Sequence, residues 1–375
     1  MPVFSCGGMR YQHAWQDAEL SAIPPANQTN LEAIIHRAIA LGINHIETAR
    51  GYGSSEVQLG AILPKLPREK IIVQTKVAPF ADPQEFVATF EKSMQRLKLD
   101  YVDLFSLHGI NNDETFEWSL RCLKAARQFQ KEGRCRFIGF STHAVPRVIT
   151  AAINTGEFDY VNLHWYFVND FNWSSVLAAT RQDMGVFIIS PNDKGGMLYN
   201  PVPKMAELCR PLTPMQFNDL YCLARPEVHT LSCGASKPTD FDEHVAALEF
   251  TGAIAPIEAK LRAELERVHG PDWCAHWHEG LPEFSQVPNQ VNVSEILRLW
   301  TYAKGLDLVP WGKMRYNLLS GGGGHWFPGE MADKMDEPAL LRAIAGNPFA
   351  GKIPGILREA HALLHDAPKK RLSES

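Results

Sequence analysis

The sequence lacks the features that mark several large classes of protein. It has no block of like charges, and 37 Lys and Arg against 42 Asp and Glu give a formal net charge of −5. Because nucleic acids and anionic membranes attract a concentrated basic face, we expect neither as a partner. The densest apolar runs, such as VFII at 186–189, are far shorter than a membrane span. The opening MPVFSCGGMRYQ has no basic start followed by an apolar stretch, so no secretory signal is expected.

Paired cysteines are also missing. The seven Cys form an odd set without a CxxC pair. In a chain this long, they indicate buried reduced thiols of a cytoplasmic protein. One short segment has metal-ligand residue types, namely Cys274, His276, His278 and Glu279. Alternating positions diverge on a helix and no second Cys or His pair completes the set, so no metal is predicted.

What the sequence does contain is a regular alternation of short apolar runs and amphipathic stretches. The apolar runs are rich in β-branched residues without polar alternation, which is typical of parallel strands buried on both faces. The predicted strands are Val3–Cys6, Asn44–Thr48, Ile71–Lys76, Val102–Leu107, Phe137–Ser141, Tyr160–Leu163, Val186–Ser190 and Thr230–Gly234. Eight strands and eight helices in about 250 residues indicate an α/β protein with a closed (β/α)₈ barrel, the TIM barrel.

An open doubly wound sheet is the alternative fold. It would prefer a GxGxxG turn after the first strand, and the GG at 7–8 lacks the rest of that pattern. After residue 250 the alternation stops and helical patterns follow at Pro256–Val268, Val293–Lys304, Ala339–Ala345 and Ile356–His365. We therefore predict a barrel over residues 1–250 and a mainly helical extension over 251–375.

Four chemically active residues lie at the ends of three consecutive predicted strands. Glu47 lies at the end of the second strand and Tyr52 in the loop after it, Lys76 ends the third, and His108 follows the fourth. In a TIM barrel the C-terminal strand ends carry the active site, so these side chains are expected to meet. Each residue alone is more often structural than catalytic. Their occurrence together on neighbouring strand ends is what indicates an active site.

This combination suits hydride transfer to a carbonyl carbon, which also requires a proton at the oxygen. A free phenol with a pKa of about 10 holds its proton tightly, and an adjacent ammonium is expected to lower that pKa. Lys76 would have this effect on Tyr52, while Glu47 would keep Lys76 oriented and charged. His108 would align the substrate oxygen. In the reverse reaction, the same four residues would support oxidation of an alcohol.

The sequence resembles the aldo/keto reductase family. The matching segments are GINHIETARGYGSSEVQLG (42–60), IIVQTK (71–76), DYVDLFSLHG (100–109), IGFST (138–142) and ISPNDKGG (189–196). The resemblance implies that Tyr52 is the proton donor, Lys76 tunes its pKa, His108 orients the carbonyl and Glu47 is the carboxylate. Glu47 departs from the family's DTAxxYG motif by one methylene, which shifts the geometry of its salt bridge to Lys76.

The resemblance also implies a nicotinamide cofactor, NADP, with NAD as the alternative. Ser141 and Thr142 match the pair that holds the carboxamide, and Asn162 stands where the family usually has Gln. Ser190 to Gly196, including Gly195, would wrap the pyrophosphate with backbone amides. SCGASKP (232–238) and DEH (242–244), which includes Glu243, match the adenosine segment. Lys237, as the only cation nearby, would favour NADP through its 2′-phosphate. His143 and His164 have two interpretations, as pocket lining or as core.

The tail is similar to the C-terminal extension of reductases that append a ferredoxin-like segment. LPEFSQVPNQVNVSEILRLWTYAKG (281–305) carries this similarity. Two four-iron clusters need two sets of four Cys, and the tail has only Cys274, so no iron–sulfur cluster is expected. The sequence thus favours an NADP(H)-dependent reductase of small carbonyls. The alternative is a weak or inactive cofactor-binding sensor or partner protein on the same barrel.

Overall fold

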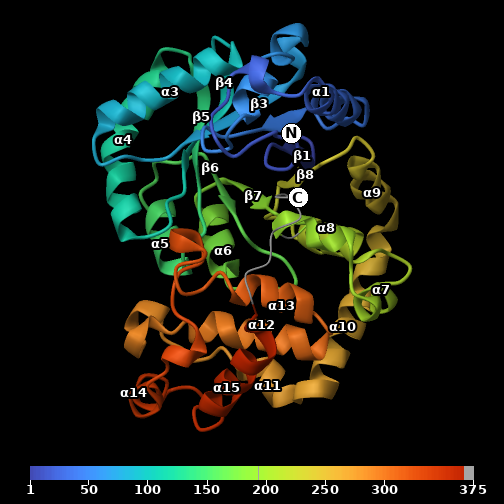
Figure 1. Cartoon of the computed structure of the whole chain (residues 1–375), viewed down its shortest axis with the longest axis vertical. Helices are drawn as coiled ribbons and strands as arrows, with labels where there is room; N and C mark the ends of the chain where they lie inside the picture. Colours follow the sequence, from blue (N-terminus) through green and yellow to red (C-terminus); the bar gives the residue numbers. More distant parts are fainter. Residues whose placement is uncertain (193, 367–375) are drawn as a thin grey trace. The chain divides into compact units, whose positions relative to one another are not determined.

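The computed structural model of the chain describes residues 1–192 and 194–366 (Figure 1). It consists of two compact units. The first contains residues 1–196 and 218–251. The second contains residues 197–217 together with the described residues from 252 onward. Residues 197–217, which lie within the predicted barrel range, therefore pack with the C-terminal helices.

The first unit is a closed barrel of eight parallel strands, in which each strand pairs with the next along the chain and the last pairs with the first. The predicted fold is thus confirmed, and the strand ends differ from the predicted ones by at most two residues. The strands are β1 (Phe4–Gly7), β2 (His45–Glu47), β3 (Ile72–Val77), β4 (Val102–His108), β5 (Cys135–Ser141), β6 (Tyr160–Leu163), β7 (Gly185–Ile189) and β8 (Thr230–Gly234).

Helices surround this sheet, and local sequence sets where several begin. Asp82 accepts a hydrogen bond from the backbone of Gln84 at the start of α3, and Asn112 forms a capping box with Thr115 at the start of α4. Proline occupies the first helical turn of α1, α3 and α5. The helices of this unit are α1 (Pro25–Ala40), α2 (Ser55–Leu59), α3 (Pro83–Leu97), α4 (Asp113–Lys131), α5 (Pro146–Ile153), α6 (Trp173–Arg181), α9 (Asp240–Ala247) and, from residue 218 onward, α8 (Pro214–Leu223).

Side chains fill the barrel interior in layers. At the bottom Leu104, Tyr160 and Phe187 form an apolar cluster. Above it lies a hydrogen-bonded polar layer, in which Gln74 Nε2 donates to Ser106 Oγ at 3.1 Å and to Asn162 Oδ1 at 3.0 Å. Because side chains alternate along a strand, the residue two positions after Gln74 faces inward again, one layer higher. That residue is Lys76, so the register places it at the mouth of the barrel.

The second unit is helical and packs around aromatic rings. Trp273 and Trp300 lie 5.4 Å apart between ring centroids, and Phe349 lies 5.1 Å from Trp273. Its helices are α7 (Pro203–Leu208), α10 (Ile254–His269), α11 (Pro271–His276), α12 (Val293–Gly305), α13 (Val309–Tyr316), α14 (Glu337–Ala343) and α15 (Ile353–Leu364). The sequence predicted α10, α12, α14 and α15. It did not predict α7, α11 and α13, whose short length gives little periodic signal.

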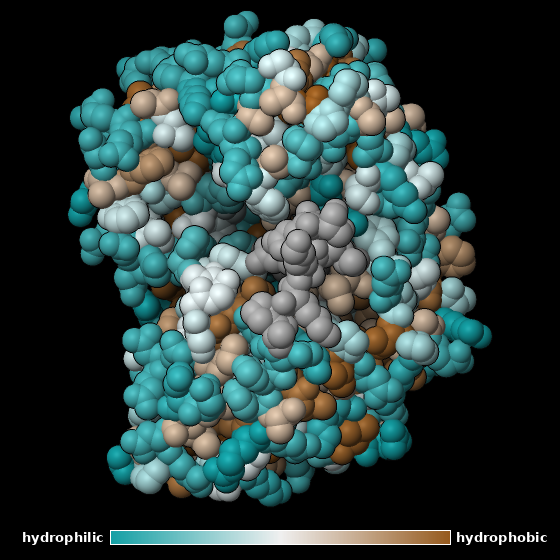
Figure 2. All heavy atoms as spheres, viewed as in Figure 1, coloured by the Kyte–Doolittle hydropathy of each residue, from teal (hydrophilic) through white to brown (hydrophobic). Residues whose placement is uncertain are grey.

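On the face drawn in Figure 2, hydrophilic side chains cover most of the surface and apolar ones are interspersed among them. Scattered apolar side chains of this kind are normal on a folded protein. Within the described ranges, no helix combines the length and apolar character needed to cross a bilayer.

Candidate active site

The predicted acid and its tuning residue lie together at the barrel mouth. Lys76 ends β3 and Tyr52 lies in the loop after β2. Lys76 Nζ is 3.4 Å from the Tyr52 hydroxyl oxygen and 4.8 Å from the centre of its ring. Lys76 is buried whereas Tyr52 is only partly buried, so the phenol is the group that faces outward.

Glu47 occupies the position expected for the supporting carboxylate. One of its oxygens forms an ion pair with Lys76 Nζ, and the other accepts a hydrogen bond from Ser232 Oγ on β8. Lys76 also donates to the carbonyl of Thr48 at 2.9 Å. Both charged groups are almost fully buried, at 2% exposed for Glu47 and 1% for Lys76. The longer side chain therefore retains the salt bridge and also reaches past β1 to contact Ser232 on β8.

A second buried carboxylate, which sequence reasoning missed, lies behind this pair. Glu56 on α2 is fully buried, accepts from Thr75 Oγ1 at 2.7 Å and pairs with Arg50 at 2.9 Å. Its negative charge favours the charged form of Lys76. The sequence offered a way to find Glu56, since it lies in the same GYGSSE segment as Tyr52.

His108 lies at the end of β4, beside Tyr52. The two rings meet edge to face, with centroids 5.5 Å apart. A carbonyl oxygen placed between them could accept hydrogen bonds from the phenol and the imidazole together. The structure thus brings all four sequence-predicted catalytic residues to one end of the barrel.

The pKa of the phenol differs from the sequence-based expectation. Burial raises the pKa of Tyr52 well above its ordinary value, and the charge of Glu47 raises it further. Lys76 was expected to lower this pKa, and its net rise shows that burial and the charge of Glu47 together outweigh any such effect of the ammonium. Burial also lowers the pKa of Lys76, against the opposing attraction of Glu47. Tyr52 consequently keeps its proton at neutral pH, which is the state that a proton donor requires.

Two histidines follow β5 and β6, and they contact each other. His143 Nδ1 lies 2.6 Å from His164 Nε2, and His164 Nδ1 lies 3.3 Å from the Tyr166 hydroxyl. His164 is buried and His143 is half-buried. His164 is thus a hydrogen-bonded interior residue, whereas His143 lies at the boundary with solvent.

The residues expected to hold a nicotinamide carboxamide lie on β5 and β6. Asn162 is buried, and its Oδ1 accepts from Gln74, but within the described residues no acceptor faces its Nδ2. Ser141 Oγ accepts from the amide of Gly109 at 3.1 Å, which leaves its own hydrogen for another acceptor. Thr142 Oγ1 instead donates to the carbonyl of Ile110 at 2.6 Å. Asn162 and Ser141 therefore offer donors that fit a carboxamide oxygen, whereas the Thr142 hydroxyl holds the loop together.

The segment after β7 was expected to contact the pyrophosphate. Ser190 has a left-handed backbone with φ of 56°, and Gly195 and Gly196 lie in a 3₁₀ helix, η4 (Lys194–Tyr199). Asn192 Nδ2 donates to the carbonyl of Gly234 at 2.9 Å, which ties this loop to β8. Asp193 lies outside the described residues.

A cation that the sequence analysis missed lies against the segment after β8. Arg10, from the loop after β1, donates to the carbonyl of Gly234 at 3.0 Å and lies 3.7 Å from the carboxylate of Asp240. Lys237 is exposed in the same segment and Glu243 is half-exposed on α9. The expectation that Lys237 is the only nearby cation is therefore wrong. Arg10 is distant in the sequence, and closure of the barrel brings β1 beside β8.

Two known enzymes are similar to this chain in sequence. The chain is 26% identical over 297 residues to L-galactose dehydrogenase from Arabidopsis thaliana, a match that covers 69% of this chain and 91% of that one. It is 29% identical over 190 residues to NADH-specific methylglyoxal reductase from Escherichia coli (strain K12), covering 44% and 56%.

Solved structures show the same fold. The aldo-keto reductase AKR11C1 from Bacillus halodurans, in its holo form, matches with a TM-score of 0.57 and 22% identity over 69% of this chain and 91% of that one. An aldo-keto reductase from Klebsiella pneumoniae in complex with NADPH matches with a TM-score of 0.56 and 18% identity over 72% and 92%. Residues 5–252, the barrel and its mouth, match the aldo/keto reductase family. The chain therefore belongs to the aldo/keto reductase family of oxidoreductases.

Proposed function

We propose that this protein interconverts small aldehydes or ketones and alcohols with NADP(H), using Tyr52 as general acid and base. The observation that carries the proposal is the 3.4 Å approach of Lys76 Nζ to the Tyr52 hydroxyl, above a buried ion pair with Glu47. Burying two charges is costly, and such an arrangement is expected where chemistry requires it.

The residues divide the reaction between them. NADPH, when bound, supplies the hydride that the carbonyl carbon accepts. The Tyr52 hydroxyl donates its proton to the carbonyl oxygen, and Lys76 stabilises the phenolate that this leaves. His108 holds the same oxygen from the other side. In alcohol oxidation Tyr52 takes the proton back as a base.

The choice of NADP over NAD rests on charge near the proposed adenosine segment. Lys237 and Arg10 both lie in or against the segment after β8, and either could meet a 2′-phosphate. Arg10 is already bound to Gly234 and Asp240, so Lys237 is the more available cation. One solved relative contains NADPH and one curated relative is NADH-specific. Affinities for NADPH and NADH, measured side by side by fluorescence titration, test the choice.

Turnover tests the catalytic assignment. The purified protein should oxidise NADPH in the presence of a panel of small carbonyls. Tyr52→Phe removes the donated proton and should lower kcat by about 100-fold to 10,000-fold, with NADPH affinity unchanged. Tyr101→Phe is the matched control, because Tyr101 precedes β4 at the opposite end of that strand from His108. Equal loss in both variants would contradict the assignment.

The replacement of the family's Asp by Glu47 is the observation that favours a second candidate, a cofactor-binding sensor or partner protein. This alternative predicts NADPH binding without turnover, and turnover that Glu47→Asp restores. The contact of Glu47 with Ser232 instead indicates a site that has adapted to the longer side chain. On the main proposal Glu47→Asp should therefore lower kcat, by as much as about 100-fold.

The C-terminal extension, residues 251–375, is proposed to be a degenerate ferredoxin-like region that holds no cluster. Its single cysteine, Cys274, cannot supply the ligands that a four-iron cluster needs. A colourless purified protein is the expected result, and the charge-transfer absorption of an iron–sulfur cluster would contradict it.

A further inference from the structure

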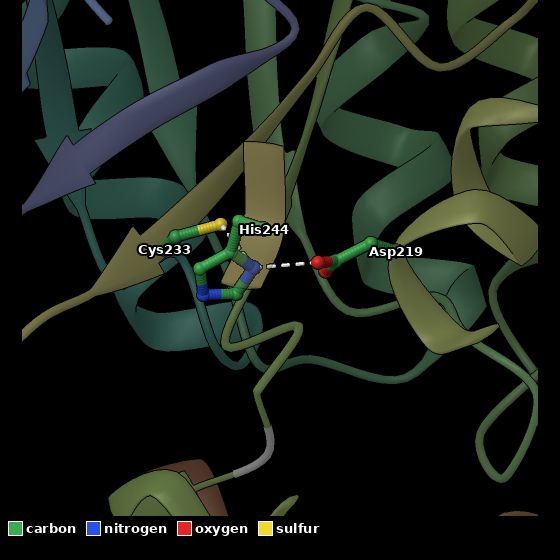
Figure 3. Close-up of side chains that lie close together, drawn as sticks. All are labelled: Asp219, Cys233 and His244. Atoms are coloured by element: carbon green, nitrogen blue, oxygen red, sulfur yellow. Dashed lines mark hydrogen bonds and ion pairs between the residues drawn. The ribbon is translucent and has the colours of Figure 1, made fainter. Parts of the chain in front are cut away.

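A second group of chemically active side chains lies in the barrel unit, on the outer side of β8. It consists of Asp219 from α8, Cys233 from β8 and His244 from α9 (Figure 3). Ser232, the preceding residue on β8, points inward to Glu47. Because neighbouring residues on a strand face opposite sides, Cys233 points away from the active site, toward the helices. This group is therefore separate from the catalytic residues.

The three side chains converge on one point and are fully buried. His244 Nδ1 lies 2.5 Å from Asp219 Oδ2 and 3.7 Å from Cys233 Sγ. The three donor atoms all lie within 4.8 Å of one another (Figure 3). A thiol, an imidazole and a carboxylate are the donor types that bind zinc.

One atom of the group has no partner of its own. Asp219 Oδ1 is buried and makes no hydrogen bond within the described part of the chain. A buried carboxylate oxygen without a partner costs on the order of 1–3 kcal/mol or more. The ion pair with His244 satisfies only the other oxygen, Oδ2. A hydrogen-bonded Asp–His pair alone therefore explains only part of this arrangement.

Charge balance is compatible with a divalent cation at this point. In the forms that bind metal, Cys233 is a thiolate, Asp219 a carboxylate and His244 a neutral imidazole, with a total charge of −2. A cation of charge +2 makes the buried group neutral, which a low-dielectric interior requires. One oxygen of Asp219, Nδ1 of His244 and Sγ of Cys233 supply three of the four donor atoms that a tetrahedral zinc ion takes, and a water molecule can supply the fourth.

We propose that Asp219, Cys233 and His244 form a structural binding site for Zn²⁺ that joins α8 and α9 to β8. Donors of a tetrahedral zinc ion lie roughly 3.3–3.7 Å apart, which matches the separation of Cys233 and His244. Asp219 withdraws by about 1 Å on binding, since its short contact with His244 is a hydrogen bond that the ion replaces. Binding releases the Cys233 thiol proton and the proton shared by Asp219 and His244.

This site departs from the expectation that the protein binds no metal. That expectation came from sequence spacing, and the ligands here are too widely spaced to form a motif. Cys233 and His244 are 11 residues apart, and Asp219 and His244 are 25 apart. The fold of three successive elements brings them together.

Metal analysis of the whole chain tests the proposal, with Cys233→Ser as the variant and Cys135→Ser as the control. Cys135 is a buried thiol in β5, outside the group. The protein is expressed in zinc-supplemented medium and purified without added metal or chelator, since the buried site must fill during folding. We expect about one zinc per chain in the wild type and in Cys135→Ser, and at least about tenfold less in Cys233→Ser.

Cobalt provides a second measurement, whose main result needs only the wild-type protein. Wild-type protein produced with Co²⁺ should show the thiolate-to-cobalt charge-transfer absorption of a cysteine ligand, and Asp219→Asn should weaken it. Circular dichroism confirms that each variant is folded. Folded wild-type protein without zinc and without this absorption would overturn the proposal, as would a Cys233→Ser variant that retains its zinc. Neither result bears on Tyr52, so failure here leaves the proposed reductase function standing.

Discussion

The barrel unit encloses ionisable side chains at one end of its sheet, whereas the C-terminal unit packs its helices around tryptophan rings. Glu47, Glu56 and Lys76 are each at most 2% exposed. In the C-terminal unit Arg298 is equally buried, but it pairs with Glu295 on its own helix and lies over the ring of Trp311. A buried ion pair contributes little to stability, so the cluster at the barrel mouth indicates chemistry. The aromatic core of the other unit indicates a scaffold.

Breaking the buried ion pair should have the largest effect. Lys76→Met removes the ammonium and leaves Glu47 buried without its counter-charge, which should lower the free energy of unfolding by about 3–5 kcal/mol. It should also abolish measurable carbonyl reduction, since the phenolate of Tyr52 loses its stabilising charge. Urea unfolding followed by circular dichroism measures the first effect, and NADPH oxidation the second.

A double variant separates the two effects. Lys76→Met combined with Glu47→Gln removes both charges and should recover most of the lost stability, because no unpaired charge remains. Turnover should stay absent. Recovery of turnover together with stability would show that Lys76 acts only as a structural partner, and the contrast between the two units would then lose its basis.

The difference between the units also explains what the sequence could predict. The barrel strands alternate with helices at a regular period, so the order of β1 to β8 and the meeting of Tyr52, Lys76 and His108 follow from chain order alone. Contacts between distant segments do not follow in this way. Arg10 reaches Gly234, and Ser232 reaches Glu47, only because the barrel closes between β1 and β8.

The pKa values of the site residues were the other property that the sequence could not predict. Residue types alone suggested that Lys76 acidifies Tyr52, but the direction of a pKa shift depends on burial and on every charge nearby. Burial and the charge of Glu47 make the net shift of the Tyr52 pKa an upward one. In the C-terminal unit, short helices such as α11 give little periodic signal, and their packing depends on aromatic contacts across the unit.

A matched pair of substitutions in the C-terminal unit should have a smaller effect. Trp273 Nε1 donates to Thr301 Oγ1 at 3.0 Å, whereas Trp300 Nε1 is buried and has no partner in the described part of the chain. Trp273→Phe and Trp300→Phe remove similar volume, but only the first breaks a hydrogen bond. Trp273→Phe should therefore lower the free energy of unfolding by about 1 kcal/mol more.

Urea unfolding of the two variants measures this difference, and NADPH turnover per folded molecule should be equal in both. A scaffold that takes no part in the chemistry predicts this equality. A selective loss of turnover in either variant would mean that the aromatic core supports the active site, and the division of roles between the units would have to be revised.

The pH dependence of the barrel site should show the smallest change over the neutral range. The pKa of Tyr52 is raised by burial and by Glu47, so its proton stays in place as the pH rises, and reduction should be constant from about pH 6 to about pH 8. Burial lowers the pKa of Lys76, so the ammonium is lost below the ordinary lysine value of about 10.4, before the phenol ionises. The alkaline decrease in kcat/KM should thus precede tyrosinate formation in ultraviolet difference spectra of wild type against Tyr52→Phe. If the two curves coincide, Tyr52 itself titrates in this range, and the ion pair does not hold the phenol in its protonated form.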